Sequence, residues 1–402
     1  MNVARETTDH RVVIHDFGGH PFTVQLARAL ASRGHRVLYL HAEGLRSPRG
    51  SVVARDADPP TLAIESVGIT ERIHEAVGPR RYTQERRYAR ALELRVAGYR
   101  PTVVIGATGA LTIQAAAQRA ARAGGARFIY WLQDVQSAAI SRLLGGRSAI
   151  VGRLAGAVAE HVERRLLREA DVVVSITPDF VPVLERWGVQ AARIALIPNW
   201  APLEELSYAP DLSDWAARRG VTTRPIFLYS GTLGRKHDPS LLLGLAASLP
   251  DASVIVISEG TGTDWLKRQP LPPNLRLWPP QPPDDLSTLL ATADVLVALL
   301  SQDAGVFSVP SKVLTYLAAG RPILAAMPAN NQAAEVIREA NAGVVTDPGD
   351  RTAFLQAAGL LAQDPGSREA AGKAARRYAE RSFDIEGVTD RFEELLGDGM
   401  NR

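Results

Sequence analysis

The sequence predicts the α/β fold class, with two doubly wound parallel sheets that each carry helices on both faces. Two observations predict this class. Short apolar runs alternate with amphipathic helical patterns along almost the whole chain, which is typical of parallel strands joined by helices. The alternation also starts a second time after residue 225, and 402 residues are too many for one hydrophobic core. We therefore expect two α/β domains of about 200 residues each.

The first half shows the alternation in order from its N-terminus. Strand-like and helical stretches follow one another as RVVIHDF at 11–17, FTVQLARALASRG at 22–34, HRVLYLHA at 35–42, PTVVIGA at 101–107, GALTIQAAAQRAARAGG at 109–125, ARFIYWLQD at 126–134, HVERRLLREA at 161–170, DVVVSIT at 171–177, FVPVLERWG at 180–188 and ARIALIPN at 192–199. This order predicts a doubly wound parallel sheet.

A polar, strand-poor segment at 199–225 is interpreted as the linker to the second half. The second half then reads IFLYSG at 226–231, PSLLLGLAASLP at 239–250, ASVIVIS at 252–258, LRLWPP at 275–280, DDLSTLLATA at 284–293, DVLVALL at 294–300, PILAA at 322–326, QAAEVIREANA at 332–342 and GVVTD at 343–347. We place a Rossmann-like domain at 1–203 and another at 204–380. An amphipathic helix at 381–402 is expected to pack back on the first domain. Ligands of such sheets bind at the carboxyl ends of the strands, so a cleft between the two sheets is the expected site.

Composition excludes several classes of protein. The chain has no Cys, which removes disulfides, thiolate metal sites and cysteine nucleophiles. Its eight His residues are scattered, so no metal site is expected. No apolar run is long enough to cross a bilayer, and the N-terminus is too polar for a signal peptide, which predicts a cytoplasmic protein. A net charge of +3 does not by itself indicate a nucleic-acid partner, and none is expected.

One stretch, which begins at Arg80 and ends at Arg100, is strongly basic. It holds seven Arg and two Glu, with tyrosines and aliphatic residues between them. Two interpretations stay open. The stretch is either a solvated basic helix on the outside of the first domain, or a peripheral contact with an anionic surface such as the inner face of the membrane.

The four lysines stand out in a chain with forty-two arginines. Lys312 begins the apolar helical pattern KVLTYLA, and Ser311 before it can cap that helix with its hydroxyl. A cation at the positive end of a helix is unfavourable unless an anion joins it, so the position favours a bound phosphate or carboxylate. The alternative is a solvated lysine at an ordinary helix start.

A second lysine lies in a similar place. TLGRKHD follows the strand 226–231, so that Arg235 and Lys236 come just before the next helix and Gly231 gives the backbone a flexible turn. Glu259 and Gly260 follow another strand in a glycine-containing loop. The ammonium groups of Lys236 and Lys312 could meet on one diphosphate.

The first domain offers its own candidates after its strands. Gly18 and Gly19 expose backbone amides after the first strand, and His20 either donates to a phosphate or sugar hydroxyl or simply starts the next helix. Asp134 ends a very apolar strand and is a candidate for proton transfer or for holding a substrate hydroxyl. It could instead cap the helix that follows.

The order of these motifs resembles that of retaining, nucleotide-sugar-dependent glycosyltransferases of the GT-B architecture, in particular the family 4-like branch that builds exopolysaccharides, O-antigens and colanic acid. The resemblance covers almost the whole chain and rests on GGHPFTVQLARALASRGHRV, WLQDVQS, ADVVVSIT, LIPNW, YSGTLGRKHD, SEGTG, PPQPPDDLSTLLATADV and VPSKVLTYLAAGRPIL, in that order. It implies an acceptor-binding first domain and a donor-binding second domain.

The resemblance also implies roles for single residues. On the donor side, it implies that the nucleotide diphosphate sugar is bound by Gly18, Gly19, Gly231, Arg235, Lys236, Glu259, Gly260, Gln281, Ser311, Lys312 and Thr315. Asp134 and His20 would act as catalytic residues beside the sugar and the attacking hydroxyl. UDP is the expected nucleotide, and no metal or other cofactor is expected. The acceptor would be a saccharide, a lipid-linked intermediate or a small natural product.

The chain departs from the family pattern at one place. Many relatives carry two glutamates eight positions apart, and here the second position is Thr315 while the first lies near Phe307. Two alternative functions therefore remain on the same fold. One is a nucleotide-sugar epimerase or hydrolase, and the other is a nucleotide-sugar-binding subunit without catalytic activity.

Overall fold

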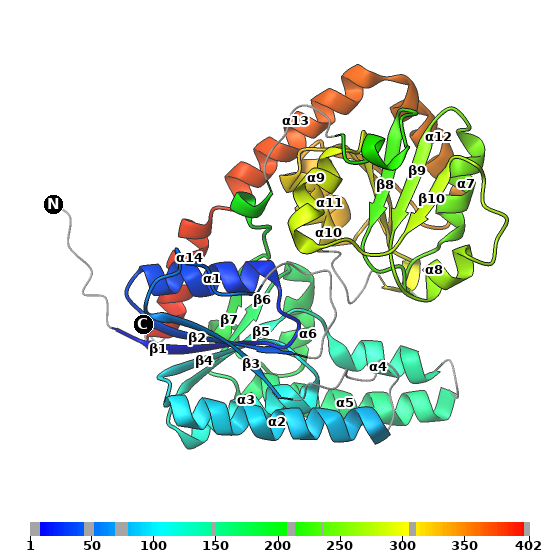
Figure 1. The fold of residues 1–402 in the computed structure, drawn as a ribbon. Coiled ribbons are helices and arrows are strands. Elements are labelled where there is room, and N and C mark those ends of the chain that lie inside the picture. The colour runs from blue at the N-terminus through cyan, green and yellow to red at the C-terminus, as the bar shows by residue number, and fades with distance from the viewer. Residues whose placement is uncertain are drawn as a thin grey trace. The chain divides into compact units, whose positions relative to one another are not determined.

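The computed structural model describes residues 9–43, 52–68, 79–145, 149–206, 214–234, 236–304 and 311–397 (Figure 1). The chain forms two compact units. Unit 1 comprises Met1–Pro198 and Ile385–Arg402, and unit 2 comprises Asn199–Asp384. Each unit is a parallel α/β domain, which confirms the expected fold class. The units divide after residues 198 and 384, whereas the sequence placed the divisions after residues 203 and 380.

Unit 1 is built on a seven-stranded sheet in which every pair of neighbouring strands is parallel. The strand order is β3-β2-β1-β4-β5-β6-β7, so the chain moves outward from β1 in one direction and then returns to build the other. The strands are β1 (Arg11–Asp16), β2 (Arg36–Ala42), β3 (Leu62–Val67), β4 (Val103–Thr108), β5 (Arg127–Leu132), β6 (Val172–Ser175) and β7 (Ile194–Leu196). β3 is absent from the elements expected above, because LAIESV has no long apolar run and only Val67 of this strand is buried.

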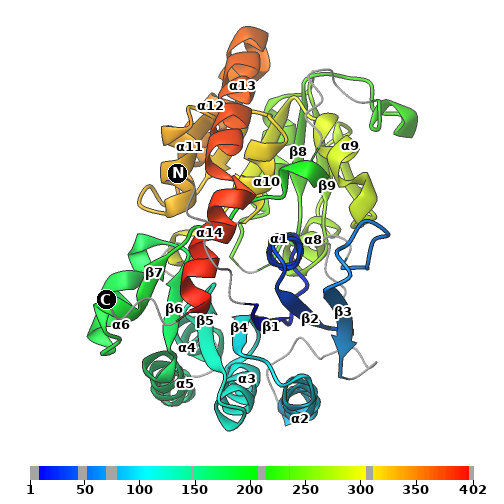
Figure 2. The same ribbon diagram turned by 90° about the vertical axis from the view of Figure 1, so that its left-hand side faces the viewer.

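Helices cover both faces of this sheet. They are α1 (Pro21–Ser32), α2 (Pro79–Tyr99), α3 (Leu111–Ala123), α4 (Gln136–Gly145), α5 (Ala149–Glu169), α6 (Val181–Arg186) and α14 (Ile385–Leu396). Figure 2 shows α1 and α14 on one face and α2, α3 and α5 on the other. The C-terminal helix is held by Trp131, whose ring lies between those of Phe22 and Phe392. Arg33, directly after α1, also donates to three carboxylates of α14, and α14 therefore completes the core of unit 1.

Unit 2 contains a six-stranded parallel sheet in the order β10-β9-β8-β11-β12-β13. Its strands are β8 (Ile226–Ser230), β9 (Ser253–Ile257), β10 (Leu275–Trp278), β11 (Val295–Leu299), β12 (Ile323–Ala326) and β13 (Gly343–Thr346). Its helices are α7 (Ser240–Ser248), α8 (Thr261–Leu266), α9 (Leu286–Ala291), α10 (Lys312–Ala318), α11 (Gln332–Glu339), α12 (Arg351–Gln363) and α13 (Pro365–Ser382). β8, β9, β11 and β12 consist almost wholly of buried aliphatic and aromatic residues, as central parallel strands require.

The segment that follows unit 1 is more than a linker. Trp215 is almost fully buried and packs edge-to-face against Trp278 of β10. The Arg219 guanidinium carbon lies 3.8 Å from the centroid of the Trp215 ring, a cation-π contact. Residues around 215 therefore belong to the hydrophobic core of unit 2. The polar composition of 199–225 concealed this, because its buried residues, such as Trp215, Ala216 and Val221, are few and scattered among polar ones.

Candidate functional site

A buried lysine lies at the start of α10 in unit 2. The side chain of Lys312 is partly covered, but its Nζ is buried and has no hydrogen-bond partner among the described residues. Nζ lies 3.8 Å from the centroid of the Tyr229 ring, and this cation-π contact stabilises the charge only in part. A buried ammonium group without an anion is unfavourable, so the site is prepared for a negative ligand.

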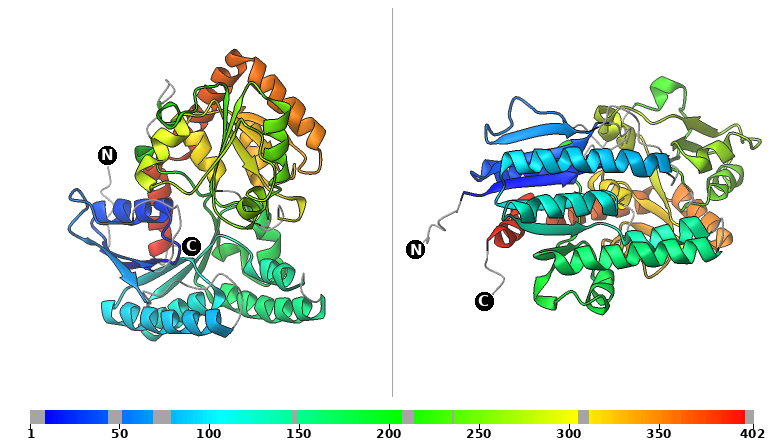
Figure 3. Two further views of the ribbon diagram at one scale, coloured as in Figure 1. Left: turned by 45° about the vertical axis from the view of Figure 1, so that its right-hand side comes forward. Right: turned by 90° about the horizontal axis from the view of Figure 1, so that it is seen from below.

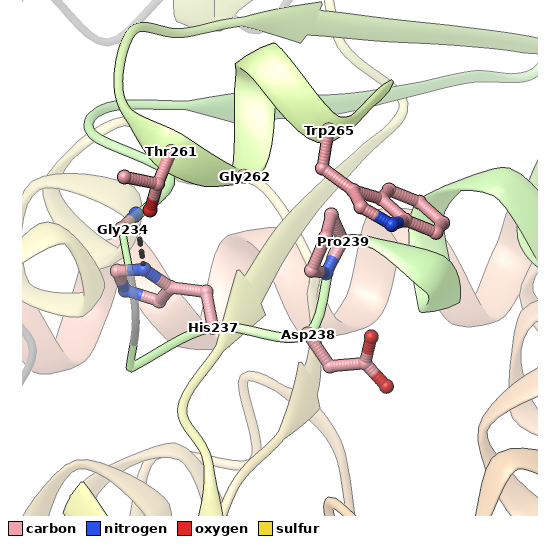
Figure 4. A pocket seen from close by; sticks show the side chains of 7 residues that line it. All are labelled: Gly234, His237, Asp238, Pro239, Thr261, Gly262 and Trp265. Carbon is pink, nitrogen blue, oxygen red and sulfur yellow. Dashed lines mark hydrogen bonds between the residues drawn. The ribbon is translucent and has the colours of Figure 1, made fainter. Parts of the chain in front are cut away.

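Two other side chains share this environment. Burial, and then the nearby charge of Lys236, lower the pKa of Lys312 to about 7. Burial, followed by the charges of Lys312 and Lys236, lowers the pKa of His237 to about 3. The Gly234 amide donates to Nδ1 of His237 at 3.0 Å, as the dashed line in Figure 4 shows. The His237 ring is thus neutral and fixed, and the two lysines supply the positive charge of the cluster.

Two glycine-containing loops approach each other beside Lys312. Gly231 follows β8 with φ of +120°, and a Cβ at this position would lie 3.4 Å from the Lys312 Nζ. Gly260 precedes α8 with φ of +111°. The loops are joined where Leu233 donates its amide to the Glu259 carbonyl at 2.9 Å and accepts from the Gly262 amide at 2.7 Å. Glycine is required at both turns because the backbone there is left-handed and closely packed.

An open pocket of about 350 Å³ lies between the loop after β8 and the start of α8. Its lining residues are Gly234, His237, Asp238, Pro239, Thr261, Gly262 and Trp265, and Figure 4 shows the loop residues facing the first turn of α8. The first amides of a helix lack partners within the helix, and they favour anions. The pocket therefore adjoins the cationic cluster on one side and a helix start on the other.

The remaining described residues expected to bind the donor are not part of the buried cluster around Lys312. Ser311 does not cap α10, because its own backbone is already helical and its hydroxyl makes no cap hydrogen bond, so that expectation was wrong. Thr315 lies one turn further along α10 and is partly exposed. Gln281 follows β10, and its side-chain amide donates to the Pro279 carbonyl at 2.8 Å. Arg235 lies outside the described residues.

Unit 1 contains a buried carboxylate at the end of β1. Asp16 is fully buried and accepts hydrogen bonds from the Gly18 amide, the His20 amide, His20 Nδ1, Thr23 Oγ1, Tyr39 OH and Thr108 Oγ1. Burial alone would raise its pKa, but the charge of His20 and the hydrogen bonds from His20, Thr108 and Thr23 hold the pKa of Asp16 well below its usual range. Asp16 is thus an anion whose partners are all supplied by the protein.

This carboxylate determines how His20 is oriented. His20 is the residue before the first turn of α1, with extended backbone and no side-chain cap bond. Its Nδ1 lies 2.9 Å from Asp16 Oδ1, so Nδ1 donates to the carboxylate and Nε2 is the ring nitrogen left for other contacts. The expectation that His20 donates to a phosphate or sugar hydroxyl stays a prediction. Reasoning from the sequence missed Asp16, although the signal was available as HDF before GGH.

Asp134 lies two residues beyond β5 and is exposed. Glu163 of α5 accepts from the amides of Gln136 and Ser137 at the start of α4, at 2.8 and 2.9 Å. Burial, and to a smaller degree the charge of Asp134, raise the pKa of Glu163. Asp134 lies in the loop that follows β5, where its side chain is accessible to solvent.

The basic stretch forms α2. Its Tyr88, Leu92 and Val96 are buried against unit 1, and Tyr88 OH pairs with His15 Nε2 at 3.0 Å. Arg95 donates to both oxygens of Glu65, and Arg81 pairs with Glu85. No helix in the described ranges combines the length and apolar character needed to span a bilayer. Among the same residues, no cluster of three or more His, Asp or Glu side chains could hold a metal ion.

Comparison with known proteins identifies the class. Residues 17–200 match the glycosyl transferase 4-like domain, and residues 214–378 match glycosyl transferases group 1. The chain is 26% identical over 308 residues to WcaI of Escherichia coli K12, a protein assigned to colanic acid biosynthesis as a glycosyl transferase, and the match covers 73% of each chain.

Solved structures share the fold over nearly the whole chain. Sucrose-phosphate synthase from Thermosynechococcus elongatus superposes with a TM-score of 0.74 at 16% identity, covering 96% of this chain and 98% of that one. HepE from Anabaena, crystallised with UDP and glucose, gives 0.69 at 14% identity, covering 96% and 99%. The chain belongs to the family 4-like glycosyltransferases of the GT-B fold. The resemblance to family 4-like glycosyltransferases of the GT-B architecture is thereby confirmed.

Proposed function

We propose that this glycosyltransferase transfers a sugar from a UDP-sugar to an acceptor hydroxyl with retention of anomeric configuration and without a divalent metal. Unit 2 binds the nucleotide diphosphate, and unit 1 serves the acceptor. The family membership supports transfer of a sugar. The similarity to HepE, which was crystallised with UDP and glucose, supports the choice of donor. The similarity to WcaI, a glycosyl transferase of colanic acid biosynthesis, supports a polysaccharide intermediate as the acceptor.

The observation that carries the proposal is the unpartnered Nζ of Lys312, as judged among the described residues. A bound diphosphate would supply the negative charge that the described residues do not provide at the Lys312 Nζ. When the bond between the anomeric carbon and the phosphate oxygen breaks, both bonding electrons stay with the nucleotide diphosphate and the sugar becomes cation-like. Lys312 and Lys236 stabilise that developing negative charge without reorganisation, because the fold already holds them in place.

On the acceptor side, Asp16 is a positioning residue and His20 contacts the attacking hydroxyl. The hydrogen bond between Asp16 and Nδ1 fixes the His20 ring, and its Nε2 is proposed to orient that hydroxyl. For retention, the hydroxyl attacks from the side that the nucleotide diphosphate leaves, and its proton passes to the departing phosphate oxygen. Asp134, exposed after β5, is proposed to hold a further hydroxyl of the sugar or the acceptor.

The test measures UDP release from a panel of UDP-sugars, with and without candidate acceptors. Acceptor-dependent release supports transfer, and NMR of the product decides between retention and inversion. Release without any acceptor would indicate a hydrolase, and conversion to another UDP-sugar would indicate an epimerase. Binding without turnover across the panel would indicate a non-catalytic subunit. Activity that persists in EDTA is expected, and its loss would contradict metal independence.

The variant that tests the site is Lys312→Met, compared with Lys373→Met. Both remove one ammonium group, but Lys373 is exposed on α13 and pairs with Glu369. We expect at least a tenfold loss of turnover only in Lys312→Met, on the order of 1.4 kcal/mol. Equal rates in the two variants would refute the proposed donor site.

A further inference from the structure

Helix α5 of unit 1 carries an exposed apolar ridge, formed by Ile150, Leu154 and Val158. These three side chains are 69%, 65% and 67% exposed. They are spaced four residues apart and therefore lie on one side of the helix, along a ridge of about 12 Å. Exposed apolar residues are ordinary when single, but three in a row on one helix face indicate a contact surface.

Packing on the opposite side of α5 fixes the orientation of this ridge. Gly152, Gly156 and Glu163 are buried. A Cβ on Gly156 would lie 2.7 Å from the Cβ of Ser141, so α4 approaches α5 too closely for any other residue there. Glu163 holds the start of α4 through two amides. The ridge therefore cannot turn inward without breaking the α4–α5 contact.

Positive charge exceeds negative charge along the ridge. Arg153 lies beside it, and the same side of α5 continues with exposed Arg164 and Arg168. Exposed Glu160 accepts from Trp187 Nε1. Figure 3 (right) shows α2, α3 and α5 side by side in one layer, and α3 packs on both neighbours. The acidic residues of this layer are largely engaged: Glu93 pairs with Arg119, and Glu169 pairs with Arg122 and Arg165.

Helix α2 adds further exposed cations to this layer. Arg86, Arg87 and Arg90 are exposed, with Arg90 lying 3.5 Å from Glu93, and Tyr82 and Leu94 are 52% and 61% exposed. The arginines nearer the core are ion-paired, as described above for Arg81 and Arg95. The outer surface of the layer thus combines a short apolar ridge with an excess of arginine.

We propose that the α5 ridge docks unit 1 on the surface of a bilayer that contains anionic lipids. Ile150, Leu154 and Val158 enter the boundary between headgroups and acyl chains, while the arginines of α5 and α2 contact the headgroups. A second copy of the chain is a less suitable occupant, because a symmetric contact would bring the two sets of arginines together. The sequence suggested a membrane contact through the basic stretch of α2 alone. In this proposal α2 supplies only positive charge, and the apolar part of the contact lies on α5.

The test is co-flotation of the full-length chain with vesicles of phosphatidylcholine, alone or with roughly one third phosphatidylglycerol. Binding to the anionic vesicles that weakens at high salt is expected. The double variant Leu154→Ser, Val158→Ser should lower the partition coefficient on the order of tenfold. The control is Leu360→Ser, because Leu360 is 70% exposed on α12 of unit 2 and its loss should change nothing. Arg86→Gln, Arg87→Gln, Arg90→Gln together should reduce the preference for anionic vesicles.

Three outcomes would overturn the proposal. The first is no binding of the unaltered chain to either vesicle, and the second is equal binding of the unaltered chain and the double variant. The third is a dimer in solution that the double variant converts to monomer, which would make the ridge an interface between copies. Circular dichroism confirms that each variant is folded. No nucleotide sugar is present in these assays, so the membrane contact and the proposed donor chemistry can fail separately.

Discussion

Asp16, the last residue of β1 in unit 1, and Lys312, the first residue of α10 in unit 2, both carry a buried charged group, but only the Asp16 carboxylate has hydrogen-bond partners among the described residues. Six donors surround the Asp16 carboxylate. The Lys312 ammonium group has no hydrogen-bond partner among the described residues. A buried charge that the protein pairs fully holds structure in place, whereas a buried charge left without a partner is prepared for a ligand.

The largest change in stability is expected from Asp16→Ala. The substitution leaves donors from several separate segments of unit 1 without an acceptor, and we expect the free energy of unfolding to fall by about 3–5 kcal/mol. Denaturant titration measures this loss. The control is Asp390→Ala, which removes an exposed partner of Arg33 and should cost less than about 1 kcal/mol. Similar losses in the two variants would show that Asp16 has no special structural role.

Lys312→Met should have the opposite effect on stability. It replaces an unpaired buried cation with an apolar side chain of similar length, so the ligand-free protein should become more stable even though turnover falls at least tenfold. Thermal unfolding with and without UDP-sugar measures both consequences, because the donor should stabilise the unaltered protein far more than the variant. A variant that loses stability in the absence of donor would argue against an unpaired charge.

Gly231→Ala tests the close approach between the loop after β8 and Lys312. The left-handed backbone costs a residue with a side chain about 1–2 kcal/mol, and the new Cβ would lie 3.4 Å from Nζ. We expect the KM for the donor to rise severalfold. Gly220→Ala is the control, since its φ of +78° is also left-handed but a Cβ there meets no atom within 4 Å. If both variants behave alike, the shape of this loop does not matter to the donor.

Ser311→Ala is expected to change the protein least. The Ser311 hydroxyl does not cap α10, so the free energy of unfolding should change by less than about 0.5 kcal/mol. Asp350→Ala should cost about 1 kcal/mol, because the Asp350 side chain does accept from the Ala353 amide. If Ser311 contacts the phosphates, its loss should raise the donor KM by about two- to tenfold. An unchanged KM would remove Ser311 from the proposed site.

The sequence was sufficient for the two-sheet architecture, because the apolar strands and their order are local properties of the chain. It also located Lys312 and Lys236 at loops beside helix starts. The side-chain environments depended on tertiary structure. The donors to Asp16 come from Gly18, His20, Thr23, Tyr39 and Thr108, and no local pattern brings these residues together.

The α5 ridge is a second case in which the sequence pattern does not determine whether side chains are buried. Ile150, Leu154 and Val158 have the spacing of a core-facing helix side, but the structure leaves them exposed. Gly152 and Gly156 occupy the buried side because α4 packs closely against it. The spacing of apolar residues therefore predicts that they share one side of the helix. Which side is buried depends on the elements that pack against the helix in the folded protein.

The number of protons taken up when the donor binds shows whether the diphosphate contacts the buried ammonium group of Lys312. In the free protein the pKa of Lys312 is lowered to about 7, mainly by burial. A bound diphosphate would raise this pKa again, so above pH 7 binding should take up a proton, and donor affinity should fall by up to about tenfold per pH unit. Titration calorimetry of a UDP-sugar near pH 8, in buffers of different ionisation enthalpy, measures that uptake. We predict proton uptake by the unaltered protein and none by Lys312→Met; equal uptake by both would show that the diphosphate does not bind at Lys312.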